Sequence, residues 1–338
     1  FECGAEAFIV KPYNVETFAA QINHILAGSS KNLLAFRDKL REDEMSAEEP
    51  QSSGLNEGEV RVTFWGTRSM GLLVPDSGSE YGRQTPCISV ETDERMFIFD
   101  AGTGIVKLGE RLMERKGPRD MWIFLSHFHM NHIMGLVHFP CLNHSSFTVR
   151  IAGAGESEKK FKDNVRELFY ASPYWPSQTP KAKLLMYEIM EDTYDLSPDI
   201  QLTAVYTNHP TTTLGYRLNV HGKIIVYIPD SEISGQPTAM EMYDEKLTGF
   251  CANADLLIHD TCYSDSDYKA HAQQGHSGAG SVVKFAGAKV KAKQLVMFNF
   301  HSTYHDEDIE LIENAAQKDA KRYNLACSAA RDGMEIII

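Results

Sequence analysis

The stretch FLSHFHMNHIMGL, residues 124–136, places three histidines within six positions directly after an apolar run. The run is typical of a buried strand, and His127 and His129 alternate on the extended chain that continues it, so both imidazoles point to the same side. His132 follows where the chain turns into a helix. Neutral imidazole is the commonest metal ligand in proteins. The stretch therefore predicts a metal site at the end of a strand, with Asn131 standing where a carboxylate is expected.

The composition is that of an ordinary globular protein. The 338 residues are 43% hydrophobic and 10% aromatic, which supplies an ample core for one large domain or two smaller ones. A formal net charge of −13 argues against a protein that holds long nucleic acid by counterion release. A small or short anionic substrate fits this charge better.

The cysteines are scattered and form no CxxC pair, so the sequence predicts neither a disulfide framework nor a thiolate zinc knuckle. No apolar run reaches the roughly 18 to 20 residues that a membrane span needs, and no basic region followed by an apolar one opens the chain. We expect a cytoplasmic protein with reduced thiols and no membrane contact. The cysteines are Cys3, Cys87, Cys141, Cys251, Cys262 and Cys327.

The opening segment FECGAEAFIVKPYN, residues 1–14, looks like the interior of a domain, which predicts that the chain is a fragment. Residues 7–10 predict a short strand that ends at Lys11, and Asn14 is placed to cap an amphipathic helix. The segment resembles the end of a response-regulator receiver domain, in which the lysine contacts the phosphoryl group. The resemblance implies that residues 1–27 are the C-terminal fragment of such a domain in a two-component regulator, with a histidine kinase as partner.

Residues 28–58 are predicted to be a linker. A second helical pattern ends near Leu40, and the chain then becomes acidic, Ser- and Gly-containing and aperiodic. The apolar stripe across residues 15–40 is suited to a dimerising helix, so a homodimer is one interpretation. Packing of that stripe on the remainder of the receiver domain is the alternative.

From residue 59 onward the pattern changes to short β-rich runs separated by turns and helices, in two successive halves. Two sheets packed face to face and covered by helices, an αββα sandwich of the α/β class, account for that order. In the first half, strands are predicted at 60–66, 87–93, 95–102, 121–127, 147–153 and 181–189, with helices at 104–117 and 157–170. In the second half, strands are predicted at 200–209, 254–260, 294–300 and 333–338, with a hairpin turning at His221 and helices at 277–288 and 306–323.

The stretch SHFHMNH resembles the HxHxDH signature of the metallo-β-lactamase superfamily. Further motifs occur in the order of the branch that contains ribonuclease Z-like and cyclic-nucleotide phosphodiesterase-like hydrolases. The resemblance implies a metallo-β-lactamase fold over residues 59–338. The motifs are VTFWGTRSM, YGRQTPCISVET, FDAGTGI, NHPTTTLGYRL, VYIPDSE, IHDTCY, GHSGAGSVV and GMEI.

This resemblance implies a site for two metals. His127, His129 and His209 would hold the first metal. Asp230 would bridge it to the second, because two cations close together need an anion between them. Asp100 would orient a ligand histidine from behind. The first set of donors is suited to zinc, with manganese or iron as alternatives.

Two residues depart from the family pattern, and both belong to the second metal. Asn131 replaces an aspartate and Asn299 stands at the position of the last histidine ligand. His132 and Asp230 remain as the strong donors, so we expect one tightly bound metal and a second that is weak or absent. The alternative is that a neighbouring histidine replaces the lost ligand: His301 or His305.

His276 in QGHSGAG matches a late histidine of this branch, which implies that it protonates the leaving oxygen. The alternative is a structural neighbour of Ser277 at a helix start. His259 lies inside an apolar strand and is explained equally well as a core histidine. Loops that border the pocket in this branch supply three candidate substrate-binding residues, with solvated loop positions as the alternative: Arg68, Ser69 and Thr85.

These expectations combine into a metal-dependent phosphodiesterase that cleaves a small phosphodiester such as a cyclic nucleotide. Asp230 and His276 would be its catalytic residues. The alternative is a catalytically impaired domain that senses a metal or a nucleotide as the effector of a response regulator. The two asparagines favour that alternative, since they weaken catalysis more than binding. A third interpretation, a scaffold for a partner protein, predicts no metal.

Overall fold

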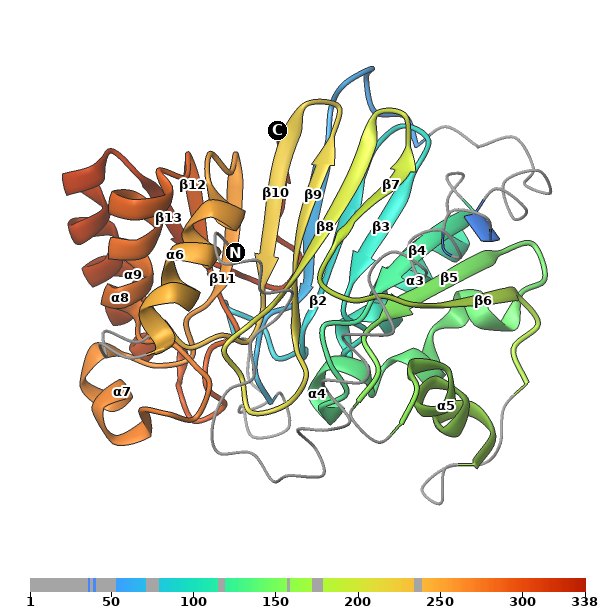
Figure 1. The fold of residues 1–338 in the computed structure, drawn as a ribbon, viewed down its shortest axis with the longest axis horizontal. Coiled ribbons are helices and arrows are strands. Elements are labelled where there is room, and N and C mark those ends of the chain that lie inside the picture. The colour runs from blue at the N-terminus through green and yellow to red at the C-terminus, as the bar shows by residue number, and fades with distance from the viewer. Residues whose placement is uncertain are drawn as a thin grey trace.

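Two seven-stranded sheets packed face to face form the centre of the molecule, and helices cover their outer faces (Figure 1). The computed structural model describes residues 36, 39–40, 53–70, 79–114, 119–156, 159–171, 179–233 and 239–338. The predicted αββα sandwich is confirmed. Among the described helices, none has the length and apolar character that crossing a membrane requires.

The first sheet has the strand order β14-β1-β2-β3-β4-β5-β6, in which β1 to β3 pair antiparallel and β3 to β6 pair parallel. Its strands are β1 (Arg61–Gly66), β2 (Cys87–Glu91), β3 (Met96–Phe99), β4 (Asp120–Phe124), β5 (Thr148–Gly153), β6 (Lys183–Glu188) and β14 (Glu335–Ile337). The helices between them are α3 (Gly104–Glu114), α4 (Met130–Ile133) and α5 (Phe161–Arg166), with helical turns at Leu136–His138, Pro140–Asn143 and Glu167–Ala171.

The second sheet has the order β13-β12-β11-β10-β9-β8-β7, antiparallel from β7 to β10 and parallel from β10 to β13. The predicted hairpin turn is confirmed: His221 and Gly222 both have positive φ, 50° and 73°, as a tight two-residue turn requires. The strands are β7 (Thr193–Ser197), β8 (Ile200–Tyr206), β9 (Leu214–Val220), β10 (Lys223–Ile228), β11 (Leu256–Asp260), β12 (Gln294–Phe298) and β13 (Ala326–Ala329). The helices are α6 (Ala239–Cys251), α7 (Asp265–His271), α8 (Ala279–Lys284) and α9 (Asp306–Ala320), with helical turns at Phe285–Val290 and Lys321–Tyr323.

The core between the sheets is rich in aromatic rings. The ring centroid of Phe99 on β3 lies 5.5 Å from that of Phe124 on β4 and 5.6 Å from that of Tyr227 on β10. Phe124 also lies 5.6 Å from Tyr216 on β9, whose hydroxyl donates a hydrogen bond to the carbonyl of Leu125 at 2.6 Å. These tilted ring pairs hold the two sheets together. They also fix the end of β4, from which the histidine-rich segment departs.

Part of the predicted linker belongs to this core. Phe36 and Leu40 are each only 7% exposed, and the Phe36 ring lies 4.8 Å from Tyr194 and 5.5 Å from Tyr187 between ring centroids. The Lys39 ammonium donates to a carbonyl of β6 at 2.7 Å. The packed unit therefore extends before residue 59, and these two apolar side chains are not available to a dimer interface. The receiver-like segment 1–27 lies outside the described residues.

Candidate metal centre

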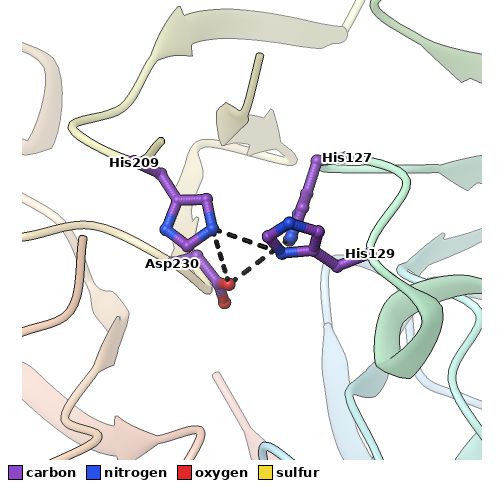
Figure 2. A group of neighbouring side chains, drawn as sticks. All are labelled: His127, His129, His209 and Asp230. Carbon is purple, nitrogen blue, oxygen red and sulfur yellow. Dashed lines mark hydrogen bonds and ion pairs between the residues drawn. The ribbon is translucent and has the colours of Figure 1, made fainter. Parts of the chain in front are cut away.

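Four predicted ligands meet where strands of both sheets end. His127 and His129 follow β4 of the first sheet, while His209 follows β8 and Asp230 follows β10 of the second sheet. Figure 2 shows the three imidazoles and the carboxylate pointing toward one another. Residues far apart in the sequence therefore form one cluster, because the two sheets present these strand ends at the same edge.

The distances within this cluster suit a divalent cation. One ligand atom of each residue lies within 4.8 Å of those of the other three. Asp230 Oδ2 is 3.5 Å from His127 Nε2 and 3.6 Å from His209 Nε2, and His209 Nε2 is 3.3 Å from His129 Nδ1. Three imidazoles and one carboxylate are a common donor set for zinc and are acceptable to iron or manganese.

An unsatisfied nitrogen supports the same conclusion. His127 is buried, its Nδ1 lies 2.9 Å from the Ser126 hydroxyl, and its Nε2 has no hydrogen-bond partner among the described residues. A buried polar atom without a partner is costly unless something binds it. Burial also lowers the pKa values of all three imidazoles, that of His209 to about 4, so they are neutral ligands near pH 7. The side chains of His127, His129, His209 and Asp230 are therefore suited to binding a metal ion.

A hydrogen bond to the backbone orients the ring of His209. Its Nδ1 donates to the carbonyl of Gly275 at 3.0 Å, which leaves the lone pair of Nε2 free to face Asp230. Gly275 has φ of +85°, and a Cβ there would lie 2.6 Å from His209 Nδ1. The close approach of this backbone therefore requires glycine.

Asp100 and His132 form a buried support for Asp230, as the family resemblance implies for Asp100. Asp100 Oδ2 lies 2.7 Å from His132 Nδ1, and the Asp100 carboxylate also accepts bonds from Ser126 and from the Tyr227 hydroxyl. His132 Nε2 faces Asp230 Oδ1 at 3.2 Å. Burial opposes a charge on His132, but the carboxylates of Asp230 and Asp100 raise its pKa to about 10. In return, and against the effect of burial, His132 holds the pKa of Asp230 well below its usual range.

The second metal position is poor in donors. Asn299, which follows β12 with φ of +65°, donates from Nδ2 to Asp230 Oδ1 at 2.9 Å and to the Pro229 carbonyl at 3.2 Å. Asn131 lies half-buried in α4. His132 Nε2 and Asp230 Oδ1 remain, and the amide of Asn299 already bonds that oxygen. The second position therefore offers fewer strong donors than the first cluster.

A second pair of titratable groups adjoins the cluster. The His276 ring lies 5.1 Å from the His209 ring, and its Nδ1 is 2.8 Å from Oδ2 of the fully buried Asp260. Burial raises the pKa of Asp260 to about 7, while Asp260, acting against the effect of burial, raises the pKa of His276 to about 9. The pair therefore shares a proton between Asp260 Oδ2 and His276 Nδ1, and Asp260 favours the protonated form of His276.

Asp260 was not predicted to take part in the site. The signal in the sequence is the polar pair His259-Asp260 at the end of an apolar strand, where only the histidine was considered. His259 is fully buried, its Nδ1 lies 2.8 Å from the backbone carbonyl of Asp260, and burial lowers its pKa to about 4. The structure therefore places His259 in the core and brings Asp260 to His276.

Two of the predicted substrate-binding residues have side chains that are buried and hydrogen-bonded to other parts of the chain. The Arg68 guanidinium is fully buried, donates to the carbonyls of Gly82 and Tyr304 and pairs with Asp306 at 3.3 Å. Thr85 is 2% exposed, and its hydroxyl accepts a hydrogen bond from the Thr103 amide at 2.8 Å.

The other loop candidates are placed as follows. Ser69 is half-buried, and its amide donates to the carbonyl of Phe300 at 3.0 Å. His301 lies beside Tyr263, with its Nδ1 2.8 Å from the Thr303 hydroxyl. His305 caps α9. Neither His301 nor His305 belongs to a group of donors that could hold a metal in the described part of the chain.

Sequence comparison finds relatives over most of the chain. A model of the beta-lactamase superfamily domain matches residues 95–300. Ribonuclease Z of Thermoplasma acidophilum is 23% identical over 310 residues, covering 78% of this chain and 93% of that protein. Ribonuclease Z of Picrophilus torridus is 26% identical over 301 residues, covering 75% of this chain and 89% of that protein.

Solved structures share the fold. The metallo-beta-lactamase fold protein YhfI of Bacillus subtilis matches with a TM-score of 0.59 at 19% identity, covering 83% of this chain and 99% of that one. A diphosphatase of the PhnP family matches with a TM-score of 0.58 at 17% identity, covering 83% and 97%. The short form of human tRNase Z matches with a TM-score of 0.53 at 21% identity, covering 82% and 98%.

Proposed function

The chain belongs to the beta-lactamase superfamily, and from that premise we propose that it is a metal-dependent phosphodiesterase acting on a small phosphodiester such as a cyclic nucleotide. The observation that carries the proposal is the cluster of His127, His129, His209 and Asp230, with the His276–Asp260 pair directly beside it. A cation site next to a protonated imidazole is the combination that cleavage of a phosphate ester needs.

The proposed mechanism divides the work between the two groups. A divalent cation, zinc in the first instance, would supply Lewis acidity at the cluster, polarising the phosphoryl group and lowering the pKa of water. His276 Nδ1 is held by Asp260 at 2.8 Å, so Nε2 is the nitrogen that donates a proton to the leaving oxygen. The side chain of His276 is 19% exposed, which gives substrate access to it. Asp260 keeps the ring oriented and protonated.

A small substrate is favoured over a long RNA. The net charge of −13 opposes the approach of a polyanion, and the buried Arg68 is not available to bind phosphate. The related proteins named ribonuclease Z and diphosphatase support hydrolysis at phosphorus without fixing the size of the substrate. We propose one tightly bound metal at the His/Asp cluster, since the second position beside Asp230 retains only His132 and Asp230 as strong donors.

A second candidate function is a sensor that binds a nucleotide or a metal without turnover. The bond between Asn299 and Asp230 favours it, because it weakens the second metal position that two-metal catalysis would use. If the chain is such a sensor, the domain is the cytoplasmic effector of a response regulator. A histidine kinase would then act on it through the receiver domain to which the receiver-like segment 1–27 belongs. The packing of Phe36 into the core supports direct contact between the segment that contains Phe36 and the domain.

The decisive experiment measures metal content and turnover on the same preparations. The purified chain is analysed for metals and assayed against cyclic nucleotides and a chromogenic phosphodiester with Zn²⁺, Mn²⁺ or Fe²⁺. We expect bound metal and turnover in the wild type, loss of turnover and of the metal held by the first cluster in His127→Ala, and neither loss in His144→Ala, whose imidazole is exposed and outside the cluster. Nucleotide binding without turnover would favour the sensor, and equal turnover in His127→Ala would overturn the proposed enzyme.

A further inference from the structure

A second group of metal-type donors lies beside the first. One carboxylate oxygen of Asp260, the sulfur of Cys262 and one ring nitrogen of His276 all lie within 4.8 Å of one another. Asp260 is fully buried, Cys262 is 1% exposed, and the side chain of His276 is 19% exposed. The group is therefore enclosed on the protein side and reached from solvent through the histidine.

The backbone around this group is firmly held. Asp260 and Cys262 are two residues apart at the end of β11, a spacing that places both side chains on the same side of extended chain. The Cys262 amide donates to Asp260 Oδ1 at 3.0 Å, and the Cys262 carbonyl accepts from the His301 amide at 3.1 Å. Between them, the Thr261 amide donates to Phe298 of β12 at 2.7 Å. The donors are thus positioned without a metal.

The buried carboxylate of this group has a cationic partner, His276, which a metal ion would replace. Asp260 is fully buried, and among the described residues its ion-pair partner is His276. Buried carboxylates are paired or coordinate metals. Among the described cysteines, Cys262 is the only one that belongs to a group of side chains able to hold a metal ion. Thiolate, imidazole and carboxylate are all donors that zinc binds in proteins.

We propose that Asp260, Cys262 and His276 form a separate zinc site. Burial raises the pKa of the Cys262 thiol well above its usual range, so the thiol is protonated when no cation is present. On binding, the thiol proton and the proton shared between His276 and Asp260 pass to solvent, and the cation takes their place. Affinity for zinc at this site therefore rises with pH.

This second site has a consequence that rests on the proposed function. Zinc there takes the carboxylate and the ring nitrogen that pair Asp260 with His276, so the imidazolium that would protonate a leaving oxygen is lost. Excess zinc is then an inhibitor of the enzyme, whereas zinc at the first cluster is required for activity. Cys262 lies outside the proposed catalytic machinery, so its removal separates the two effects.

Cobalt is the probe that tests the site itself. Co²⁺ bound by a thiolate gives an intense near-ultraviolet charge-transfer band, which the His/Asp cluster has no sulfur to produce. We expect the band in the full chain and in Cys141→Ser, a matched control whose buried thiol lies in the other half of the sandwich. The band should be absent in Cys262→Ser and retained in His127→Ala, whose turnover is lost. Failure of the proposed enzyme therefore does not remove the band.

Two further measurements keep the result interpretable. Asp260→Asn preserves the shape of the side chain and should weaken cobalt binding at the thiolate site by about tenfold or more. Excess Zn²⁺ should inhibit the wild type and Cys141→Ser but not Cys262→Ser. No thiolate band in the wild type, or the same band in Cys262→Ser, would overturn the second site. Equal zinc inhibition of wild type and Cys262→Ser would overturn its inhibitory role.

Discussion

Asn299 donates a hydrogen bond from Nδ2 to Asp230 Oδ1 at 2.9 Å, and this is the carboxylate oxygen that His132 Nε2 faces at 3.2 Å. An amide hydrogen and a metal ion compete for the same lone pairs of that oxygen. The other oxygen of Asp230 faces His127 and His209 and is free to join them at one metal. Asp230 therefore turns one carboxylate oxygen toward the His127–His209 cluster and uses the other in hydrogen bonding with Asn299 and His132.

Restoring both altered residues should create the second metal site. The double variant Asn131→Asp with Asn299→His adds a carboxylate and an imidazole beside His132 and Asp230, which gives four donors. We expect elemental analysis to rise by one metal per chain relative to the wild type, and each single variant to bind this added metal more weakly than the double. A double variant that gains neither metal nor activity would mean that these two positions do not belong to a second site.

The protonation of His276 predicts a pH limit on turnover. Its pKa is raised to about 9 by Asp260, so the imidazolium is present at neutral pH and is lost as the pH rises through about 9. The rate should fall over that interval. His276→Asn should lower kcat by about 10²- to 10⁴-fold and remove this alkaline limb.

The comparison of KM with kcat separates catalysis from structure in this variant. If His276 is the general acid, KM changes little while kcat falls, and the metal content of the first cluster stays the same. His144→Ala should keep the wild-type profile, because its imidazole is exposed and remote from the cluster. An alkaline limb that survives in His276→Asn would assign it to another group.

Much of the fold was predictable from local patterns. The alternation of strands and helices gave the two-layer sandwich, and the His221-Gly222 turn was read from its sequence. Four elements were missed: β7, β13, α6 and α7. The helix α7 has no buried residue and therefore no apolar period to detect. The edge strand β13 is only four residues long, Ala326–Ala329.

The site was predictable where motifs carry it and unpredictable where long-range packing decides. The cluster of His127, His129, His209 and Asp230 followed from spacing and resemblance. Asp260 was missed because its partner His276 is distant in sequence. The burial of Arg68 against Asp306 could not be predicted, because no local pattern reveals a contact between the two ends of the domain.

Asp100 should matter for stability and metal affinity alike. Its buried carboxylate accepts hydrogen bonds from Ser126, His132 and Tyr227. In Asp100→Asn the NH₂ group of the amide would face hydrogen-bond donors of these residues and could not accept their bonds. We expect a loss of about 3–5 kcal/mol in the free energy of unfolding and about 10- to 100-fold weaker metal binding. Asp199→Asn, whose side chain is 61% exposed, should change stability by less than about 0.5 kcal/mol. Urea unfolding and metal competition provide the two measurements.

The metal-free protein should become less stable as the pH rises. The pKa of His132 is raised from 6.5 to about 10 in the folded state by Asp230 and Asp100, although burial acts against it. The stabilisation is complete below pH 6.5 and is lost as the pH rises through about 10, because the folded state binds the proton more tightly than the unfolded state. Urea midpoints of the metal-free chain across this interval test the sign, and midpoints that rise with pH would contradict it.

Phe36 should contribute to the stability of the whole sandwich. Its ring lies between Tyr187 and Tyr194 at centroid distances of 5.5 and 4.8 Å and is only 7% exposed. Replacing Phe36 by alanine leaves a cavity at the end of the inter-sheet core, at a cost of about 3–5 kcal/mol in the free energy of unfolding. Leu311→Ala, whose side chain is largely exposed, should cost less than about 0.5 kcal/mol. If both variants unfold at the same urea concentration as the wild type, the helix around Phe36 is not part of the folded unit.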